Sequence, residues 1–211
     1  MREYLVVFGV ALAVTYLLAV VARELAHRYG AVARVRDRDV HAVPIPYFGG
    51  VAMLGGLGAA YLVATHMPFL SREADFNDAR AVLVGGAVIC AVGVVDDLFE
   101  LDALSKFAGQ VVASIIVVAM GVQLVYLPLP GNTLDIDPIQ AVLFSVFMIV
   151  LTANAVNFVD GLDGLAAGVV GIGAIAFFGY AFVLAAENGQ TRAIAAALLT
   201  AALAGACVGI L

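Results

Sequence analysis

Seven long apolar stretches, separated by short polar links, constrain this chain more than any other feature. They run over residues 4–22, 45–66, 81–95, 107–124, 139–155, 165–186 and 194–211. A helix needs roughly 20 mostly apolar residues to cross a membrane. With 64% apolar and only 12% charged residues, the chain lacks the polar surface of a water-soluble domain. We therefore expect an all-α, polytopic membrane protein with about seven transmembrane helices, forming a single integral-membrane domain over residues 1–211.

The basic residues predict the orientation of these helices. The link after the first stretch holds the densest basic cluster in the chain, Arg23, Arg28, Arg34, Arg36 and Arg38. Because cytoplasmic loops carry the excess of lysine and arginine, this link should lie inside and the N-terminus outside. Alternation then places residues 95–106 and 155–164 inside as well. The outer link 125–138 has no lysine or arginine, and its prolines, glycine and asparagine indicate a turn that could be a short hairpin.

Charge and cysteine content exclude some function classes. The formal net charge of −6 does not suit nucleic-acid binding, which calls for a basic excess, so we expect no nucleic-acid partner. Cys90 and Cys207 both lie inside apolar stretches and are interpreted as small buried hydrophobic residues. The first stretch is long and lacks a small-residue cleavage site, which favours a spanning helix over a removed signal peptide.

Two adjacent carboxylates, Asp96 and Asp97, mark the inner end of the third apolar stretch. Adjacent carboxylates repel each other and are costly near hydrocarbon. Magnesium would relieve both problems and also bridges phosphate oxygens. Lys106, at the start of the fourth stretch, could offer a positive charge to a phosphate. For this motif alone, the alternative is a solvated acidic loop with a lysine that reaches the membrane interface.

A second polar motif, NAVNFVDGLDGL, spans residues 154–165. Asn157, Asp160 and Asp163 recur every three residues and would share a face if the link continued as a helical turn. Amides can hold a base or a sugar, and carboxylates can hold a metal or ribose hydroxyls. The alternative is an ordinary polar turn, which the two Asp-Gly pairs would also favour.

A third motif, RDRDVHAVPIP at residues 36–46, precedes the second apolar stretch. Its prolines break the helix there, and Gly49 and Gly50 permit tight packing or ligand approach. His41 could bind a phosphate as imidazolium or donate a hydrogen bond. Topology alone explains the arginines, however, and a lone interfacial histidine is usually just solvated.

Together these motifs resemble the polyprenyl-phosphate N-acetylhexosamine-1-phosphate transferases. The resemblance is carried by Asp96-Asp97 with Lys106 and Gln110, by NAVNFVDGLDGLAAG at residues 154–168, and by RDRDVHAVPIP followed by Gly49-Gly50. It covers the whole chain. The segment LDALSKFAGQ at residues 101–110 is most similar to the actinobacterial branch, which makes decaprenyl-diphospho-N-acetylglucosamine.

The resemblance implies a glycosyl-1-phosphate transferase of the bacterial inner (cell) membrane, with its active face in the cytoplasm. N-acetylglucosamine-1-phosphate would pass from UDP-N-acetylglucosamine to decaprenyl or undecaprenyl phosphate, releasing UMP, as the first membrane step of cell-wall glycan synthesis. The implied partners are the UDP-amino sugar, the polyprenyl phosphate lipid and the membrane, and a homodimer is compatible with the family. Magnesium is the implied cofactor, with manganese as the alternative.

The same resemblance implies roles for the motif residues. Asp96 and Asp97 would be catalytic, with Asp97 accepting a proton from the lipid phosphate or helping to hold the metal. Asp97 and Asp160 would be the metal contacts. The implied substrate-binding residues are Asn157, Asp160, Asp163, Lys106 and His41. Positioning and charge stabilisation should supply most of the rate acceleration in such a reaction.

Members of the family are considerably longer than 211 residues. They carry a further aspartate motif and a histidine-rich loop, neither of which occurs here. We therefore expect the chain to be an N-terminal portion, truncated at its C-terminus relative to the family. Three alternatives remain open: a phospho-N-acetylmuramoyl-pentapeptide transferase, a non-catalytic remnant and a membrane transporter. The transporter is disfavoured because the apolar stretches contain almost no acidic residues.

Overall fold

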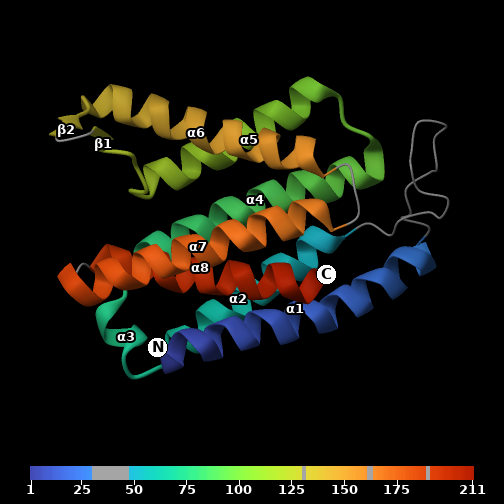
Figure 1. Cartoon of the computed structure of the whole chain (residues 1–211). Helices are drawn as coiled ribbons and strands as arrows, with labels where there is room; N and C mark the ends of the chain where they lie inside the picture. Colours follow the sequence, from blue (N-terminus) through green and yellow to red (C-terminus); the bar gives the residue numbers. More distant parts are fainter. Residues whose placement is uncertain (30–47, 130–131, 161–163, 189–190) are drawn as a thin grey trace.

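The computed structural model describes residues 1–29, 48–129, 132–160, 164–188 and 191–211. Within these ranges the elements are α1 (Arg2–Tyr29), α2 (Gly49–Ala64), α3 (Leu70–Glu73), α4 (Phe76–Phe99), α5 (Ala103–Ala119), β1 (Tyr126–Leu129), β2 (Asn132–Asp135), α6 (Pro138–Val159), α7 (Leu165–Asn188) and α8 (Thr191–Ile210). Each predicted apolar stretch coincides with one of the long helices. The expected all-α, polytopic membrane architecture is confirmed, and Figure 1 shows the arrangement.

In the described part of the chain, five helices are long and apolar enough to cross a membrane by length and composition, namely α1, α4, α6, α7 and α8. The apolar helices α2 and α5 are shorter, at 16 and 17 residues. At a rise of 1.5 Å per residue they extend about 24–26 Å, slightly less than the roughly 30 Å of a hydrocarbon core. The number of predicted apolar helices is therefore confirmed, while two of them fall short of the full membrane thickness.

The hairpin expected in the link that lacks basic residues is present. Strands β1 and β2 pair antiparallel, with Tyr126 opposite Asp135 and Leu129 opposite Asn132. The helix α3 was not predicted. It forms because the Glu3 carboxylate on α1 accepts hydrogen bonds from the backbone amides of Phe69 and Leu70, at 2.9 and 2.8 Å.

Helix α8 lies at the centre of one group of helices, α1, α2, α7 and α8, here called the α8 bundle. Its small residues let it approach α1 closely. A Cβ atom added to Gly205 would overlap the Phe8 carbonyl oxygen, and one added to Gly209 would lie 2.5 Å from the Leu12 carbonyl oxygen. Small residues one helical turn apart are a common means of close helix packing in membranes.

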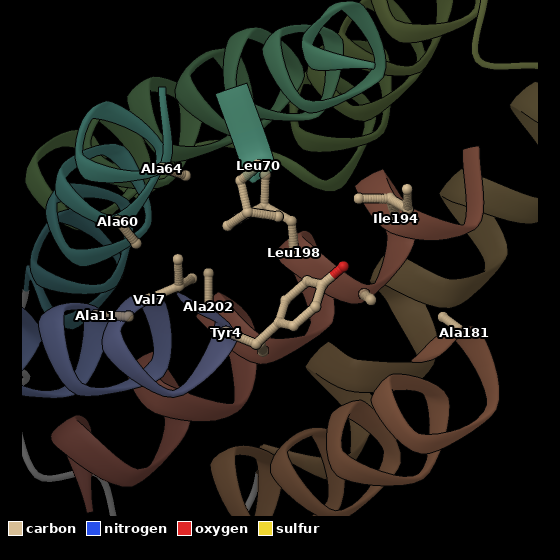
Figure 2. Close-up of a cluster of buried hydrophobic side chains, with 12 residues drawn as sticks. Tyr4, Val7, Ala11, Ala60, Ala64, Leu70, Ala181, Ile194, Leu198 and Ala202 are labelled. Atoms are coloured by element: carbon tan, nitrogen blue, oxygen red, sulfur yellow. The ribbon is translucent and has the colours of Figure 1, made fainter. Parts of the chain in front are cut away.

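Buried side chains gather where these helices meet α3 (Figure 2). Tyr4 contributes the largest ring and forms edge-to-face contacts with Phe178 and Phe182 of α7 at centroid distances of 5.6 and 5.9 Å. The other buried members of this cluster are Val7, Ala11, Ala60, Ala64, Leu70, Ala181, Ile194, Ala197, Leu198, Ala201 and Ala202. The cluster joins α1, α2, α3, α7 and α8 into one packed unit.

Helices α4, α5 and α6 form a second group, here called the α4–α6 arm. Helix α4 joins the arm to α2 and α8, and α5 packs between α4 and α6. Figure 1 shows that the α4–α5 turn, the end of α6 and the start of α2 lie at one end of the helices, whereas the hairpin and α3 lie at the other. The Asp96-Asp97 pair and the described start of the second motif thus lie at the end that the sequence assigned to the inside.

Candidate functional site

The turn between α4 and α5 is built by local capping. Glu100 ends α4 in the left-handed region, at φ 49° and ψ 67°. Asp102 then caps α5, because its carboxylate accepts hydrogen bonds from the Ser105 hydroxyl at 2.5 Å and the Ser105 amide at 3.4 Å. The Ser105 hydroxyl is the main reason that the pKa of Asp102 lies below its ordinary value. The cap sets Lys106 in the first turns of α5.

Asp96 connects the two sides of this turn. Its Oδ1 atom accepts a hydrogen bond from the backbone amide of Leu101 at 2.9 Å. Its Oδ2 atom pairs with the Lys106 ammonium at 2.8 Å, and the exposed fractions of the two side chains are 26% for Asp96 and 44% for Lys106. Because both of its oxygens are engaged, Asp96 fixes where the lysine charge lies.

Asp97 is half-buried beside this ion pair. Its carboxylate interacts with the charges of Asp96 and Lys106 and with the backbone amide of Phe48, the residue before α2. The start of α2 therefore reaches the acidic pair, and this contact was not foreseen from the sequence. His41, which the sequence placed in the same link, lies outside the described residues.

The second motif lies at the end of α6. Asp160 caps the helix, and its amide donates to the Val156 carbonyl at 3.0 Å. The side chains of Asn157 and Asp160 are both exposed at this end. Asp163 lies outside the described residues. Gly164 has a φ of 74°, a conformation that favours glycine, and its carbonyl accepts the first backbone bond of α7 from Gly168.

A pair of side-chain amides connects α5 to α6 near this end. The Asn154 Nδ2 atom donates to Gln110 Oε1 at 2.6 Å and to the Val150 carbonyl of its own helix at 2.8 Å. Both amides lie in the motifs found in the sequence, but neither was predicted to have a role in the site. Their spacing could have indicated one, since Gln110 lies four residues after Lys106 and Asn154 lies three residues before Asn157.

Taken together, the described residues bring Asp96, Asp97 and Lys106 into one cluster. The end of α6, which carries Asn157 and Asp160, lies at the same end of the helices as the α4–α5 turn (Figure 1). Helix α5 packs against both α4 and α6 and so connects the two sets. Within the described residues, no three histidine, cysteine, aspartate or glutamate side chains are grouped closely enough to hold a metal by themselves. The arrangement offers carboxylates, amides and one ammonium group to a polar ligand at the membrane surface.

These features define a multi-pass membrane protein with a polar, acidic site at one end of its helices. Residues 79–211 match the family model described as glycosyl transferase family 4, and the chain belongs to that family. The matched residues contain both Asp96-Asp97 and the NAVNFVDGLDGL motif.

Several curated relatives are similar over the full chain. The chain is 41% identical to decaprenyl-phosphate N-acetylglucosaminephosphotransferase of Mycolicibacterium smegmatis, covering 100% of this chain and 53% of the relative. It is 42% identical to the protein of the same name from Mycobacterium tuberculosis, covering 100% and 54%. A phospho-N-acetylmuramoyl-pentapeptide-transferase of a Mycobacterium species is 32% identical, covering 100% and 68%. The chain thus spans about half the length of the first two relatives.

Proposed function

We propose that the protein transfers N-acetylglucosamine-1-phosphate from UDP-N-acetylglucosamine to a polyprenyl phosphate at the cytoplasmic face of the bacterial cell membrane. This would be the first membrane step of cell-wall glycan synthesis. The observation that carries the proposal is the cluster of Asp97, Asp96 and Lys106 next to the start of α2, at the same end as Asn157 and Asp160. Membership of the family and the names of the relatives support it.

In the proposed reaction, an oxygen of the lipid phosphate attacks the β-phosphorus of the UDP-sugar. A new P–O bond forms, the bond from the β-phosphorus to the oxygen bridging the two phosphates breaks, and UMP leaves with that bond's electrons. Phosphate monoesters are largely ionised near pH 7. The protein therefore does not need to create a strong nucleophile, and we assign its residues mainly to positioning and charge stabilisation.

We assign the charged residues as follows. Lys106 stabilises phosphate charge, and Asp96 holds that ammonium in place through the 2.8 Å ion pair. Asp97 lies beside the pair and accepts the remaining proton of the lipid phosphate or contacts the metal. Asn157 and Asp160 are assigned to the nucleotide side. The earlier prediction that Asp96 is itself catalytic stays a prediction, although its two engaged oxygens favour a holding role.

Magnesium suits this set of donors, with manganese as the alternative. Magnesium in proteins is usually bound by one or two carboxylates together with substrate phosphates and water, so a three-residue cage is not required. Asp97 and Asp160 would hold it, since both oxygens of Asp96 are occupied within the protein. When bound, the ion would neutralise the negative charge of the diphosphate.

The N-acetylmuramoyl-pentapeptide donor is the second candidate. The chain is 32% identical to a relative named for that activity, compared with 41% for one named for N-acetylglucosamine phosphate transfer. The higher identity favours N-acetylglucosamine. A transporter is disfavoured, because the family is one of glycosyl transferases and because the charged motifs lie at helix ends instead of along a path through the membrane.

The direct test is UMP release by the purified protein in nanodiscs that contain decaprenyl phosphate. We expect magnesium-dependent release from UDP-N-acetylglucosamine, and formation of a lipid-linked product. Asp97→Asn should reduce the turnover roughly 100-fold. Asp78→Asn is the matched control, because Asp78 lies on the same helix at its opposite end, and it should leave turnover unchanged. Undiminished turnover in Asp97→Asn, or release from the muramoyl donor alone, would contradict the proposal.

A further inference from the structure

The amide pair Gln110–Asn154 is not used by the proposed chemistry, yet it forms a side-chain hydrogen bond between α5 and α6. The Nδ2–Oε1 distance is 2.6 Å. Gln110 is half-buried, and its backbone carbonyl accepts a further bond from the Ser114 hydroxyl at 2.7 Å. An amide inside a membrane helix is costly unless it finds a partner, so each of these side chains favours the presence of the other.

The position of this pair relates it to the site. Lys106 lies four residues before Gln110 on α5, and Asn157 lies three residues after Asn154 on α6, so each lies on the same helix face as its amide. The chain runs along α5 toward the hairpin and returns along α6 (Figure 1). Lys106 and Asn157 are therefore both displaced from the amide pair in the same direction, by about one helical turn or ~5 Å.

Within the described chain, few side chains of α6 are buried. Its described buried residues are Ala141, Ser145 and Val150. The Ser145 hydroxyl anchors the outer half, because it accepts a hydrogen bond from the backbone amide of Leu124 at 2.8 Å. The Gln110–Asn154 bond is the corresponding anchor on the inner half. Loss of the inner anchor would leave the end that carries Asn157 free to slide or tilt along α5.

We propose that Gln110 and Asn154 are positioning residues that fix the register of α6 on α5 and thereby hold Asn157 opposite Lys106. The proposal rests on the proposed function, in which Lys106 contacts phosphate and Asn157 lines the nucleotide pocket. Neither amide touches the substrate. A slip of one turn moves the two groups about 5 Å apart along the helix axes, far more than a reaction that depends on alignment can tolerate.

The register can be measured without a substrate. Spin labels at Leu104 and Phe158, whose side chains are 75% and 91% exposed, report the separation of the inner ends of α5 and α6. The labels require a background in which Cys90 and Cys207 are replaced by alanine. Pulsed electron paramagnetic resonance should give one narrow distance in the parent. Gln110→Leu and Asn154→Leu should each broaden it or shift it by up to about 5 Å.

Two further variants sharpen the distance measurement. The exchange Gln110→Asn with Asn154→Gln keeps both amides and should restore the parent distance. Thr152→Val is the matched control, since the Thr152 hydroxyl bonds only to the Met148 carbonyl of its own helix among the described contacts. It should leave the distance unchanged. An unchanged distance in both leucine variants would overturn the proposal.

Kinetics then distinguish positioning from the other roles. We expect either leucine variant to lower kcat for UMP release about tenfold, the double variant to be no worse than the poorer single one, and the exchanged pair to recover. A rise in KM confined to Asn154→Leu, with additive losses, would show direct substrate contact and overturn the proposal. A lower unfolding temperature with unchanged kcat in the leucine variants would also overturn the proposal. If the parent releases no UMP, the proposed function fails, and the spin-label distances alone decide whether the register depends on the amides.

Discussion

Helices α8 and α6 are similar in length and hydropathy but differ greatly in burial. They have 20 and 22 residues, and their most apolar windows have mean hydropathies of 2.2 and 2.1. Yet 67% of that window is buried in α8 and only 11% in α6. Helix α8 is rich in alanine and glycine and is surrounded by α1, α2 and α7, whereas α6 presents large side chains such as Phe147, which is 57% exposed. Hydropathy predicts that a helix enters the membrane, and small residues let neighbouring helices pack closely there.

The same contrast separates the two groups of helices. The α8 bundle is joined by backbone-to-backbone approach and by the cluster around Tyr4. In the α4–α6 arm, α5 packs closely on α4, whereas α6 has few buried side chains and is connected to its neighbours by polar contacts. Binding and catalytic elements are commonly drawn from the less tightly packed parts of a protein. We therefore expect substitutions in the bundle to affect stability, and substitutions in the arm to affect turnover.

The largest effect should come from Lys106, the only lysine in the chain. Lys106→Gln removes the positive charge beside Asp96 and Asp97. We expect UMP release to fall roughly 100-fold, because stabilising the phosphate charge is the main contribution of the proposed site to catalysis. Arg80→Gln is the control and should retain turnover, because Arg80 lies near the start of α4, at the opposite end from Asp96 and Asp97. Parental turnover in the Lys106→Gln variant would show that the α4–α6 arm takes no part in the reaction.

A substitution in the bundle should affect stability instead. Gly205→Ala places a methyl group against the Phe8 carbonyl, and overpacking of this kind costs about 1–3 kcal/mol. Gly173→Ala on α7 is the matched control, because its Cβ would meet nothing within 4 Å. Thermal unfolding followed by circular dichroism should show a lower transition temperature for the first variant only. Equal transition temperatures would mean that the close α1–α8 contact contributes nothing to stability.

Asp96→Asn should have an intermediate effect on turnover. The asparagine oxygen can still accept the bond from Leu101, but the ion pair with Lys106 is lost. We expect a loss of about tenfold, or ~1.4 kcal/mol of transition-state stabilisation, which is less than for Asp97→Asn. Parallel UMP-release assays of the two variants check this order. A greater loss in Asp96→Asn than in Asp97→Asn would restore a direct catalytic role for Asp96.

The smallest effect concerns pH and the cap of α5. The Ser105 hydroxyl lowers the pKa of Asp102 in the folded protein. A depressed pKa stabilises the fold above the unfolded-state pKa of about 3.9, and that contribution disappears as the pH falls through the folded pKa. Unfolding temperatures between pH 6 and pH 3 should therefore converge for the parent and Asp102→Asn. Parallel curves over this range would show that the Asp102 charge does not stabilise the turn.

Much of the fold follows from the sequence because hydropathy and turn residues act locally. All the long helices and the hairpin were predicted in that way. What the sequence did not predict depends on contacts between distant residues. Helix α3 depends on Glu3, which lies 66 residues before Phe69. Hydropathy also could not distinguish α6 from α8, because their mean hydropathies are nearly equal and their different burial depends on which helices surround each of them.

The sequence predicted which residues form the site, but it did not predict how these residues contact one another. Asp96, Asp97 and Lys106 were grouped from spacing and from the resemblance, but the engagement of both Asp96 oxygens depends on how the chain reverses at Glu100. The approach of Phe48 to Asp97 joins segments that are far apart in sequence. The pairing of Gln110 with Asn154 likewise depends on which faces of α5 and α6 meet, and periodicity within one helix does not contain that information.

Sidedness provides the most direct test of the central claim, that the α4–α5 turn and the end of α6 face the same compartment. Single cysteines at Ala103, Asp160 and Leu134 would be placed in a protein lacking Cys90 and Cys207 and exposed to a membrane-impermeant maleimide. In spheroplasts only the hairpin cysteine at position 134 should react, and in inside-out vesicles only those at positions 103 and 160. Reaction of positions 103 and 160 from opposite sides of the membrane would contradict the account.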